Sequence, residues 1–449
     1  MKKMMMRLCA AALLLLGCGG PADTTGALTQ PQGREVAFVG VNVVPADSER
    51  VLGDQTVLVR GEQIVEVGPA AKVKVPGGAL RIDGRGKYLM PGLAEMHGHI
   101  PPPQAPKEFT EAVLFMYVAN GVTTVRGMLG APGQLELRER ANRGELISPT
   151  LYLAGPSFNG NSVNSPAQAA EMVRAQKREG WDLLKVHPGL TRDEYDAMAR
   201  TAREVGIRFA GHVPAEVGLP HALASGQETI DHVDGYVEHL RAEGAPLDEA
   251  KLAGVVRLTK RSGAWIVPTM ALWETLLGVA SIEKLMSYPE LQYMPPQQVG
   301  SWERLHRARQ SDPQFDRKKA EQTAANRKRI LKALHDAGVP VIFGTDAPQQ
   351  FSVPGFSVHR EMASMLEAGM TPYEIIRTAT RNAGEYYKNR ARFGTVAAGR
   401  RADLILVNGN PLKDISNVAR RSGVMVRGRW LAEDEIQKRL GAIASSHGR

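Results

Sequence analysis

Short apolar runs alternate with amphipathic stretches through the middle of this chain of 449 residues. Eight such runs have the length and composition of buried strands: 92–99, 122–128, 150–154, 182–187, 208–213, 229–234, 265–269 and 341–346. The stretches between them, such as 167–180, 192–205 and 316–337, are amphipathic in the way helices are. This alternation predicts βαβ units around a parallel sheet. Eight repeats, with no glycine-rich dinucleotide motif after the first strand, favour an α/β fold of the closed (β/α)8 TIM-barrel type.

The pattern changes at both ends of this region, where short β-type runs are punctuated by Gly and Pro. They occupy 36–44, 56–60, 63–67 and 81–83 before the repeats, and 394–396, 402–407 and 423–429 after them. We expect both ends to pair in a small accessory β-sandwich of residues 35–89 and 388–435. The barrel would then span 90–387, and residues 436–449 would form a tail.

The extreme N-terminus has the pattern of an export signal. Residues 1–18 begin with basic side chains and continue with an apolar run at 8–16, which is too short to span a bilayer. Residues 15–18, Leu-Leu-Gly-Cys, resemble a bacterial lipobox, which predicts lipidation of Cys18; an ordinary cleaved signal is the alternative. Residues 19–34 have the composition of a flexible tether. We therefore expect an exported protein, anchored by lipid in the bacterial cell envelope on the periplasmic or outer-membrane side.

Composition narrows the chemistry of any site in the body of the chain. Both cysteines, Cys9 and Cys18, lie in the leader, so a disulfide scaffold and a thiolate zinc site are excluded. The formal charge of +9 comes from the two ends of the chain. Residues 371–449 carry 15 Lys and Arg against 7 Asp and Glu, and the leader carries three more cations. No basic helix with interleaved aromatic residues is present in the sequence, so we expect no nucleic-acid partner.

Polar side chains end five of the predicted strands. His97 and His99 are two apart on the first strand, so they project from the same face. The other strand-end groups are Lys185, His212, His232 and Asp346. Any one of them could be a satisfied core residue or an ion pair. The carboxyl ends of barrel strands meet at one face, however, so five together predict a cluster. Imidazole and carboxylate donors without a thiolate suit a catalytic Zn²⁺ or a similar ion.

The order His-x-His, Lys, His, His, Asp on successive strands resembles the amidohydrolase superfamily of metal-dependent hydrolases. The chain is most similar to its imidazolonepropionase-related and Xaa-Pro dipeptidase branch, over residues 36–416. Further shared motifs are 121–126 (GVTTVR), 344–347 (GTDA), 359–361 (HRE) and the segment 394–404.

The resemblance implies a centre of two divalent metal ions, of which Zn²⁺ is the expected one. His97, His99 and Asp346 would bind one ion and His212 and His232 the second. Lys185 would bridge both as a carbamate formed with CO₂, and a salt-bridging lysine is the alternative. An ammonium group beside two dications would be repelled, which favours the carbamate.

The resemblance also implies a reaction, in which a metal-bridging hydroxide hydrolyses an amide or peptide C–N bond. Asp346 would act as general base and then general acid. The expected substrate is a small molecule: a dipeptide (Xaa-Pro-like) or an N-acyl amino acid. The alternatives are a cyclic amide, lactone or organophosphate hydrolase, a mononuclear deaminase or imidazolonepropionase-type enzyme, and a non-catalytic binding lipoprotein. The number of metal ions per chain separates these alternatives: two, one or none, respectively. Lys185 favours the first, because single-metal members of the family generally lack a bridging lysine.

Four further residues are candidate substrate contacts. Arg126 ends the second strand and could hold a substrate carboxylate through its planar guanidinium, with a structural ion pair as the alternative. His187 lies two residues after Lys185, so both share a face. Tyr236 and His359 follow strands six and eight.

Other positions affect the site less directly. Asp234 shares a face with His232, which makes it a candidate for support of the ligands. Glu95 stands where the family usually has Asp, and Gly127 where an Asp often follows Arg126. Neither change removes a ligand. The polar segment 294–315 is either a lid over the barrel mouth or a surface insertion. A homo-oligomer is left open.

Overall fold

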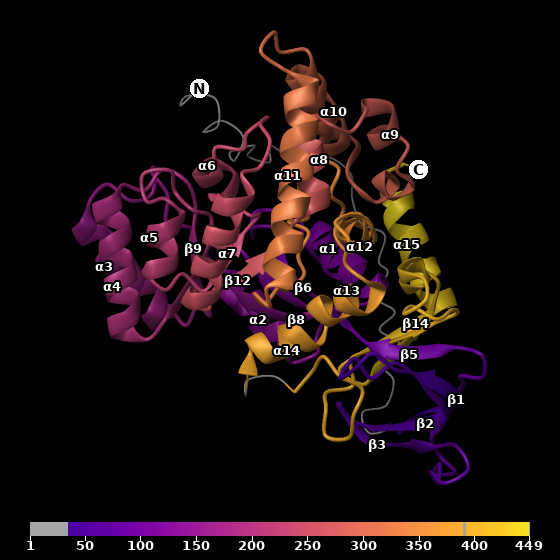
Figure 1. Ribbon diagram of the computed structural model, residues 1–449. Helices are drawn as coiled ribbons and strands as arrows, with labels where there is room; N and C mark the ends of the chain where they lie inside the picture. The colour runs from indigo at the N-terminus through magenta and orange to yellow at the C-terminus, as the bar shows by residue number, and fades with distance from the viewer. Residues whose placement is uncertain (1–34, 389–391, 449) are drawn as a thin grey trace.

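The computed structural model describes residues 35–388 and 392–448 (Figure 1). The predicted leader with Cys18 and the tether at 19–34 lie outside these residues. No helix in the described part of the chain is both long and apolar enough to cross a membrane.

Seven of the eight predicted barrel strands are present in the expected order. They are β6 (Leu93–Gly98), β7 (Val122–Gly127), β8 (Thr150–Leu153), β9 (Leu183–Val186), β10 (Arg208–Gly211), β11 (Thr229–Asp231) and β12 (Trp265–Val267). Parallel pairing joins β6, β7 and β8 in one sheet and β9 to β12 in another. Two isolated bridges, Ala154 to Leu183 and Phe158 to Val186, connect the segment after β8 with β9.

The eighth predicted strand, 341–346, is not a strand in the structure. It bridges to β12 at Val341, and the Asp346 amide then donates to the His97 carbonyl at 2.6 Å. The segment thus lies between β12 and β6 without a continuous ladder, and the sheets are not closed into one. Asp346, at the end of this segment, has a left-handed backbone with φ of 62°. The fold is an α/β, TIM-barrel-like arrangement.

Helices follow most of the strands and surround the sheets (Figure 1). They are α1 (Lys107–Ala119), α2 (Gln134–Asn142), α3 (Pro166–Glu179), α4 (Arg192–Val205), α5 (Leu219–Ala224), α6 (Tyr236–Leu240), α7 (Glu249–Ser262), α8 (Met270–Leu276), α9 (Ile282–Met286), η2 (Pro289–Tyr293), α10 (Pro296–Gln310), α11 (Arg317–Asp336), α12 (Ser357–Glu367), α13 (Pro372–Ala379) and α14 (Arg381–Tyr386). Helix α4 shows why they form. A capping box of Thr191 and Glu194 begins it, Gly206 with φ 65° ends it, and Tyr195 and Met198 are buried.

Both ends of the chain build one accessory sheet beside the barrel (Figure 1). Its strands are β1 (Val36–Val43), β2 (Leu52–Arg60), β3 (Gln63–Pro69), β4 (Leu80–Asp83), β5 (Tyr88–Pro91), β13 (Leu404–Val407), β14 (Arg421–Val426) and β15 (Arg429–Ala432). The order is β15-β14-β13-β5-β1-β2-β3, with β4 on β1, so the antiparallel pair β5–β13 joins the two ends. Its core includes Phe38, Leu89, Leu404 and Trp430. The structure shows one sheet here, and a sandwich of two is not confirmed.

The predicted tail at 436–449 is mostly helical instead. After η4 (Ile415–Ala419) and the last strands, α15 runs over Glu433–Ser446. Three acidic residues in its first turn interact favourably with the helix dipole. Ile436, Leu440 and Ala444 recur at helical spacing and form its buried face.

The segment between β12 and α11 is an insertion of three helices and η2. It contains the predicted polar stretch 294–315, most of which is α10. Trp302 of α10 packs on Phe351, with ring centroids 5.9 Å apart, and Tyr293 stacks on Phe356 at 5.0 Å. The insertion therefore rests on the loop that follows Asp346; its action as a lid stays a prediction.

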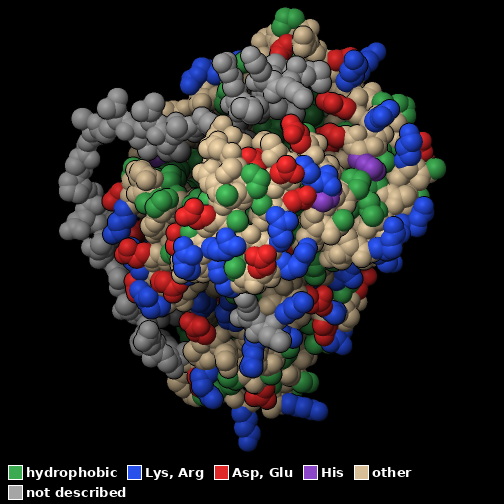
Figure 2. Space-filling model, turned by 90° about the vertical axis from the view of Figure 1, so that its left-hand side faces the viewer, with side chains coloured by type: hydrophobic (Ala, Val, Ile, Leu, Met, Phe, Trp, Pro, Cys, Tyr) green, Lys and Arg blue, Asp and Glu red, His purple; other side chains and the backbone are tan. Residues whose placement is uncertain are grey.

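Charges of both signs cover the face formed by α3, α4 and α5. Lys and Arg side chains lie among Asp and Glu side chains there (Figure 2). Arg174 of α3 pairs with Glu204 of α4 at 3.6 Å, and Arg192 pairs with Asp196 within α4 at 3.5 Å. The net positive charge of the chain is therefore not concentrated on this face.

Candidate metal centre

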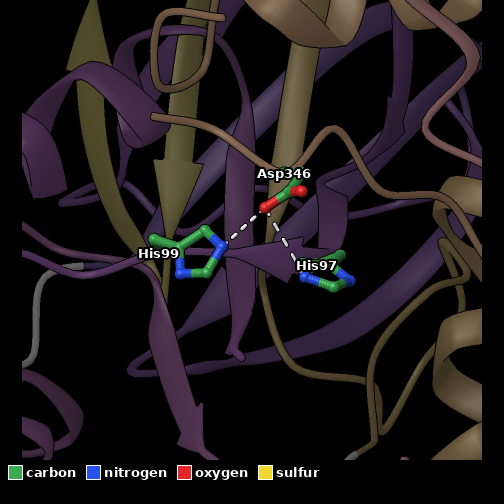
Figure 3. A group of neighbouring side chains, drawn as sticks. All are labelled: His97, His99 and Asp346. Carbon is green, nitrogen blue, oxygen red and sulfur yellow. Dashed lines mark hydrogen bonds and ion pairs between the residues drawn. The ribbon is translucent and has the colours of Figure 1, made fainter. Parts of the chain in front are cut away.

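The end of β6 and the segment that follows α11 bring three metal-binding groups together. Asp346 lies between the two imidazoles of β6, with its Oδ1 2.5 Å from His99 Nε2 and 3.5 Å from His97 Nε2 (Figure 3). One donor atom from each residue lies within 4.8 Å of the others. His97 is buried, whereas His99 and Asp346 keep a small exposed area. Such a group could hold a divalent ion.

The backbone that carries Asp346 is held close to its neighbours. A Cβ atom at Gly344 would lie 2.5 Å from Val267 Cγ1 and 2.9 Å from the His97 amide nitrogen, so only glycine fits this approach. Asp346, His232 and Thr269 all have a left-handed backbone, with φ of 62°, 64° and 50°. Each such residue costs on the order of 1–3 kcal/mol, and strain of this kind gathers at functional sites.

The remaining three predicted ligands lie in the same cluster. Lys185 is fully buried, with its Nζ 3.2 Å from His97 Nε2. The His232 ring lies 4.5 Å from the rings of both His97 and His212, and its Nε2 lies 3.8 Å from Asp346 Oδ2. All six side chains named from the sequence are thus brought together; whether each binds a metal stays a prediction.

The orientation of the imidazoles fits metal binding. The Nδ1 atoms of three of them face an oxygen: Asp231 Oδ2 at 2.8 Å for His97, Asp234 Oδ2 at 2.5 Å for His212, and Thr269 Oγ1 at 2.8 Å for His232. The Nε2 atoms point away from these oxygens: that of His97 lies 3.2 Å from Lys185 Nζ, and that of His232 is buried without a hydrogen-bond partner in the described structure. Metal-ligating histidines are commonly held in this way.

Burial also sets the protonation that a metal needs. It lowers the pKa of His97 and of His232 well below the usual value, so both imidazoles are neutral and carry a free lone pair. Burial lowers the pKa of Lys185 as well. A neutral amine is the form of lysine that reacts with CO₂. Nitrogen and carboxylate donors, with no thiolate, suit Zn²⁺ or a related ion.

Glu95 ties the two ligand-bearing segments together. Its Oε1 accepts from the His97 amide at 3.0 Å and the Thr345 amide at 2.8 Å, and its Oε2 accepts from the Thr345 hydroxyl at 2.6 Å. Burial raises the pKa of Glu95 to about 7. The residue that departs from the family's usual Asp therefore fixes β6 against the Asp346 segment.

The candidate substrate contacts divide into two groups. His187 lies at the cluster, with its ring 5.0 Å from that of His212, and burial lowers its pKa well below the usual value. Arg126 is buried inside the barrel, and its Nε donates to the Met96 carbonyl at 2.6 Å.

The other two candidates face partners outside the cluster. The Tyr236 hydroxyl lies 2.7 Å from Thr259 Oγ1 on α7, and His359 Nε2 lies 3.3 Å from Asn120 Oδ1. The structure therefore does not bring Tyr236 or His359 to the metal-binding groups.

Comparison with known proteins agrees with this geometry. The amidohydrolase family pattern matches residues 88–431, which is most of the chain. The chain belongs to the amidohydrolase family. It is thus an enzyme of a metal-dependent hydrolase family, and its His-His-Asp group lies where such a family needs one.

Curated amidohydrolase relatives differ in the reactions that their names state. The chain is 26% identical to imidazolonepropionase of Arthrobacter sp. (strain FB24), over 80% of this chain and 89% of that protein. It is 23% identical to adenine deaminase 3 of Rhizobium meliloti (strain 1021), over 93% of this chain. The match spans only 59% of that deaminase.

Solved structures support the fold of this family member. A bottromycin amidohydrolase superposes with a TM-score of 0.74 at 23% identity, covering 93% of this chain and 91% of that one. A Xaa-Pro dipeptidase with bound methionine in its active site gives a TM-score of 0.67 at 22% identity, covering 89% and 100%. At these identities the likeness establishes the amidohydrolase fold.

Two groups that hold the ligands were not found from the sequence. Asp231, which faces His97, precedes His232 in β11, and Thr269, which faces His232, follows β12. The available signal was a charged residue, Asp231, at the end of the short and fully buried strand Thr-Ile-Asp. Thr269 gave no comparable signal.

Proposed function

We propose that this amidohydrolase hydrolyses an amide or peptide C–N bond, with two divalent metal ions, most simply Zn²⁺, at the His97–Asp346 cluster. The proposed substrate is a dipeptide ending in proline or an N-acyl amino acid. One observation carries the proposal: six side chains that can bind a metal converge on a buried imidazole nitrogen, His232 Nε2, which has no hydrogen-bond partner within the described residues. Leaving such a group unpaired costs about 1–3 kcal/mol, which a bound metal ion would offset.

Each metal would have its own set of residues. His97, His99 and Asp346 would hold one ion, and His212 and His232 the other. Lys185 would stand between them as a carbamate, formed when its neutral amine adds to CO₂ and releases a proton. Bound ions would supply a Lewis acid that lowers the pKa of water and polarises a carbonyl group.

The chain's own residues would then direct the proton. Asp346 lies within 4 Å of the Nε2 atoms of three imidazoles and keeps a small exposed area, so it can face a water molecule. It would take the proton from the attacking water and pass it to the leaving nitrogen, as a general base and then a general acid. His187, beside His212, would contact the substrate from the β9 side.

A second candidate function is deamination or opening of a cyclic amide at a single metal ion. The likeness to an adenine deaminase and to an imidazolonepropionase favours it, and His97, His99 and Asp346 by themselves form a three-donor group. Lys185 at 3.2 Å from His97 Nε2 favours the two-metal alternative, because a carbamate at this position would supply oxygen donors to both ions.

Metal counting and a substrate panel together test the proposal. The protein would be reconstituted with Zn²⁺ in bicarbonate buffer and assayed with prolyl dipeptides, N-acyl amino acids, adenine, cyclic amides and lactones. We expect two ions per chain in the wild type, fewer than two in Lys185→Met, and turnover of a linear amide. One ion in both proteins, with turnover of adenine or a cyclic amide alone, would favour the second candidate instead.

We further propose that the protein is exported and held at a membrane through Cys18. The support is the order of a basic start, a short apolar run and Leu-Leu-Gly-Cys at 15–18. Detergent-phase partitioning of the wild type, and its loss in Cys18→Ala, is the expected result. Equal partitioning of both into the aqueous phase would contradict the lipid anchor.

A further inference from the structure

Arg126 connects the metal centre to the opposite end of the barrel. We propose that it is a positioning residue, which fixes the metal-binding imidazole of His97 through Asp231. The inference rests on the proposed function, because it concerns how firmly the proposed metal site is held. It replaces the expectation that Arg126 binds a substrate carboxylate.

The guanidinium of Arg126 is fully buried and almost fully bonded. Its Nε donates to the carbonyl of Met96, the residue before His97, at 2.6 Å. Its Nη2 donates to Thr229 Oγ1 at 3.3 Å and to Asp231 Oδ1 at 3.4 Å. The side chain thus holds both the backbone and the polar partner of one metal-binding residue.

Asp231 passes this constraint to the imidazole. Its Oδ1 is fixed from one side by Arg126 and by the Thr229 hydroxyl, which donates at 2.6 Å. Its Oδ2 then lies 2.8 Å from His97 Nδ1, a close contact that is not an aligned hydrogen bond. A carboxylate facing Nδ1 favours a proton on that nitrogen, which leaves the Nε2 lone pair for a metal.

The other side of the guanidinium is anchored away from the site. Arg126 Nη1 donates to the Tyr386 hydroxyl at 3.0 Å, and that hydroxyl donates to Glu228 Oε2 at 2.8 Å. Glu228 precedes β11 and pairs with Arg208 at 3.3 Å. All three nitrogens of Arg126 are occupied, so its planar fork is not available to a substrate.

The removal of Arg126 would leave Asp231 as a buried carboxylate without a guanidinium. Lys185 Nζ is 4.0 Å from Asp231 Oδ2, so Lys185 is the remaining cation that could turn toward it. Such a pairing would draw both Asp231 and Lys185 out of the positions that the metal centre needs. We therefore expect the loss of Arg126 to weaken metal binding rather than substrate binding.

The test compares Arg126→Met and Arg126→Lys with the wild type, all loaded with Zn²⁺. The readouts are the rate of Zn²⁺ loss to a colorimetric chelator, kcat and KM, and the melting temperature of the metal-free protein. Arg126→Met should lose metal about 10–100 times more easily, with kcat reduced and KM within about twofold of the wild-type value. Arg126→Lys keeps the charge but not the fork, so it should recover part of the retention.

Two neighbouring tyrosines provide a matched pair. Tyr386→Phe removes the hydroxyl that accepts from Arg126, and it should speed metal loss by a few fold. Tyr387→Phe removes a buried hydroxyl that has no hydrogen-bond partner in the described structure, and it should leave metal retention unchanged. If Arg126→Met does not fold, Asp231→Asn is the alternative variant. It keeps the shape of Asp231, the residue between Arg126 and His97, and should show the same loss of metal.

The outcomes separate this inference from the proposed function. Absence of metal in the wild type would overturn the proposed function itself. Wild-type metal retention in Arg126→Met would overturn the positioning role alone, including when only the melting temperature falls, as for a purely structural ion pair. A raised KM with unchanged metal retention would restore the substrate-binding role.

Discussion

The two ends of this barrel both contain buried charges, but they use them differently. At the amino-terminal end, Asp403 accepts from Arg401 Nε at 2.6 Å and from the Arg427 amide at 2.8 Å, while the two arginines also donate to Thr124 and Thr150. We refer to these five residues as the Asp403 cluster. Each of these donors has an acceptor, and each oxygen of Asp403 has a donor.

The carboxyl-terminal end has a different balance. His232 Nε2 has no hydrogen-bond partner in the described structure, and Lys185 lies against the His97 imidazole. Asp346, His232 and Thr269 all have left-handed backbones. Polar groups that form hydrogen bonds with one another stabilise the fold. Buried polar groups that lack such partners are candidates for binding a ligand or a metal ion. The contrast is between charges that pair with one another, in the Asp403 cluster, and a group of metal-binding side chains that includes a buried imidazole nitrogen without a hydrogen bond.

Asp346→Asn gives the largest expected effect. The amide keeps an oxygen that can bind a metal but cannot accept the proton, so kcat should fall by about 10²–10⁴-fold while metal stays bound. Steady-state kinetics and metal analysis on the same sample check this. Asp47→Asn, at an exposed pair with Arg50, is the control and should keep wild-type kcat. A metal-loaded Asp346→Asn with full activity would show that another group moves the proton.

Asp403→Ala tests the other end of the comparison. It leaves Arg401 and the Arg427 amide without their acceptor, so the free energy of unfolding should fall by about 3 kcal/mol. The number of metal ions per chain should not change. Denaturant unfolding and metal analysis measure the two quantities, and Asp47→Ala should cost less than about 1 kcal/mol. Loss of metal in Asp403→Ala would mean that the two ends are not independent.

Much of the fold follows from features that the sequence displays directly. Apolar runs with turn residues between them located seven strands. The polar residues at the ends of the apolar runs predicted one cluster, and the structure brings them together: His97, His99, Lys185, His212, His232 and Asp346. The eighth predicted run, 341–346, does not form a strand, although its polarity pattern resembles that of the other seven. Helix α15 was missed although Ile436, Leu440 and Ala444 have helical spacing, since the segment was read as a tail.

Side-chain direction is what the sequence could not supply. Arg126 stands near the carboxyl end of β7, yet its guanidinium reaches Tyr386, which contacts Glu228 at the start of β11. The alternation of strand residues predicts that Arg126 points inward but not which way it leans along the barrel axis. Tyr236 and His359 have the same limitation, because their partners Thr259 and Asn120 come from distant segments.

Asp234→Asn gives a smaller expected effect at the metal-binding end. Asp234 holds Nδ1 of His212 at 2.5 Å, so the change should weaken metal retention about tenfold without abolishing turnover. Chelator competition measures it. Asp196→Asn is a matched control, because Asp196 makes an equally short contact to His221 on the surface, remote from the cluster. Equal metal retention in Asp234→Asn and Asp196→Asn would mean that the carboxylate does not support the ligand.

Glu361→Gln has the smallest expected effect. It concerns a buried carboxyl group that belongs neither to the Asp403 cluster nor to the metal-binding group. Glu361 is fully buried, accepts from the amides of Met270 and Ala271 at 2.9 and 2.8 Å, and forms no ion pair in the described part of the chain. Burial raises its pKa from 4.5 to about 8. Between these pH values the unfolded chain releases the proton and the folded chain keeps it, so this group's contribution to stability falls as pH rises.

The glutamine variant does not titrate, so its stability relative to the wild type should increase steadily from pH 5 to pH 8. Denaturant unfolding of both metal-free proteins at four pH values measures the difference. Asp83→Asn is the control, because the pKa of that exposed carboxyl is lowered to about 2 by Arg85 and it does not titrate in this range. A constant difference between Glu361→Gln and the wild type would mean that Glu361 is ionised throughout. The two backbone amides at the start of α8 would then satisfy a buried charge without a cation, which the Asp403 cluster does not do.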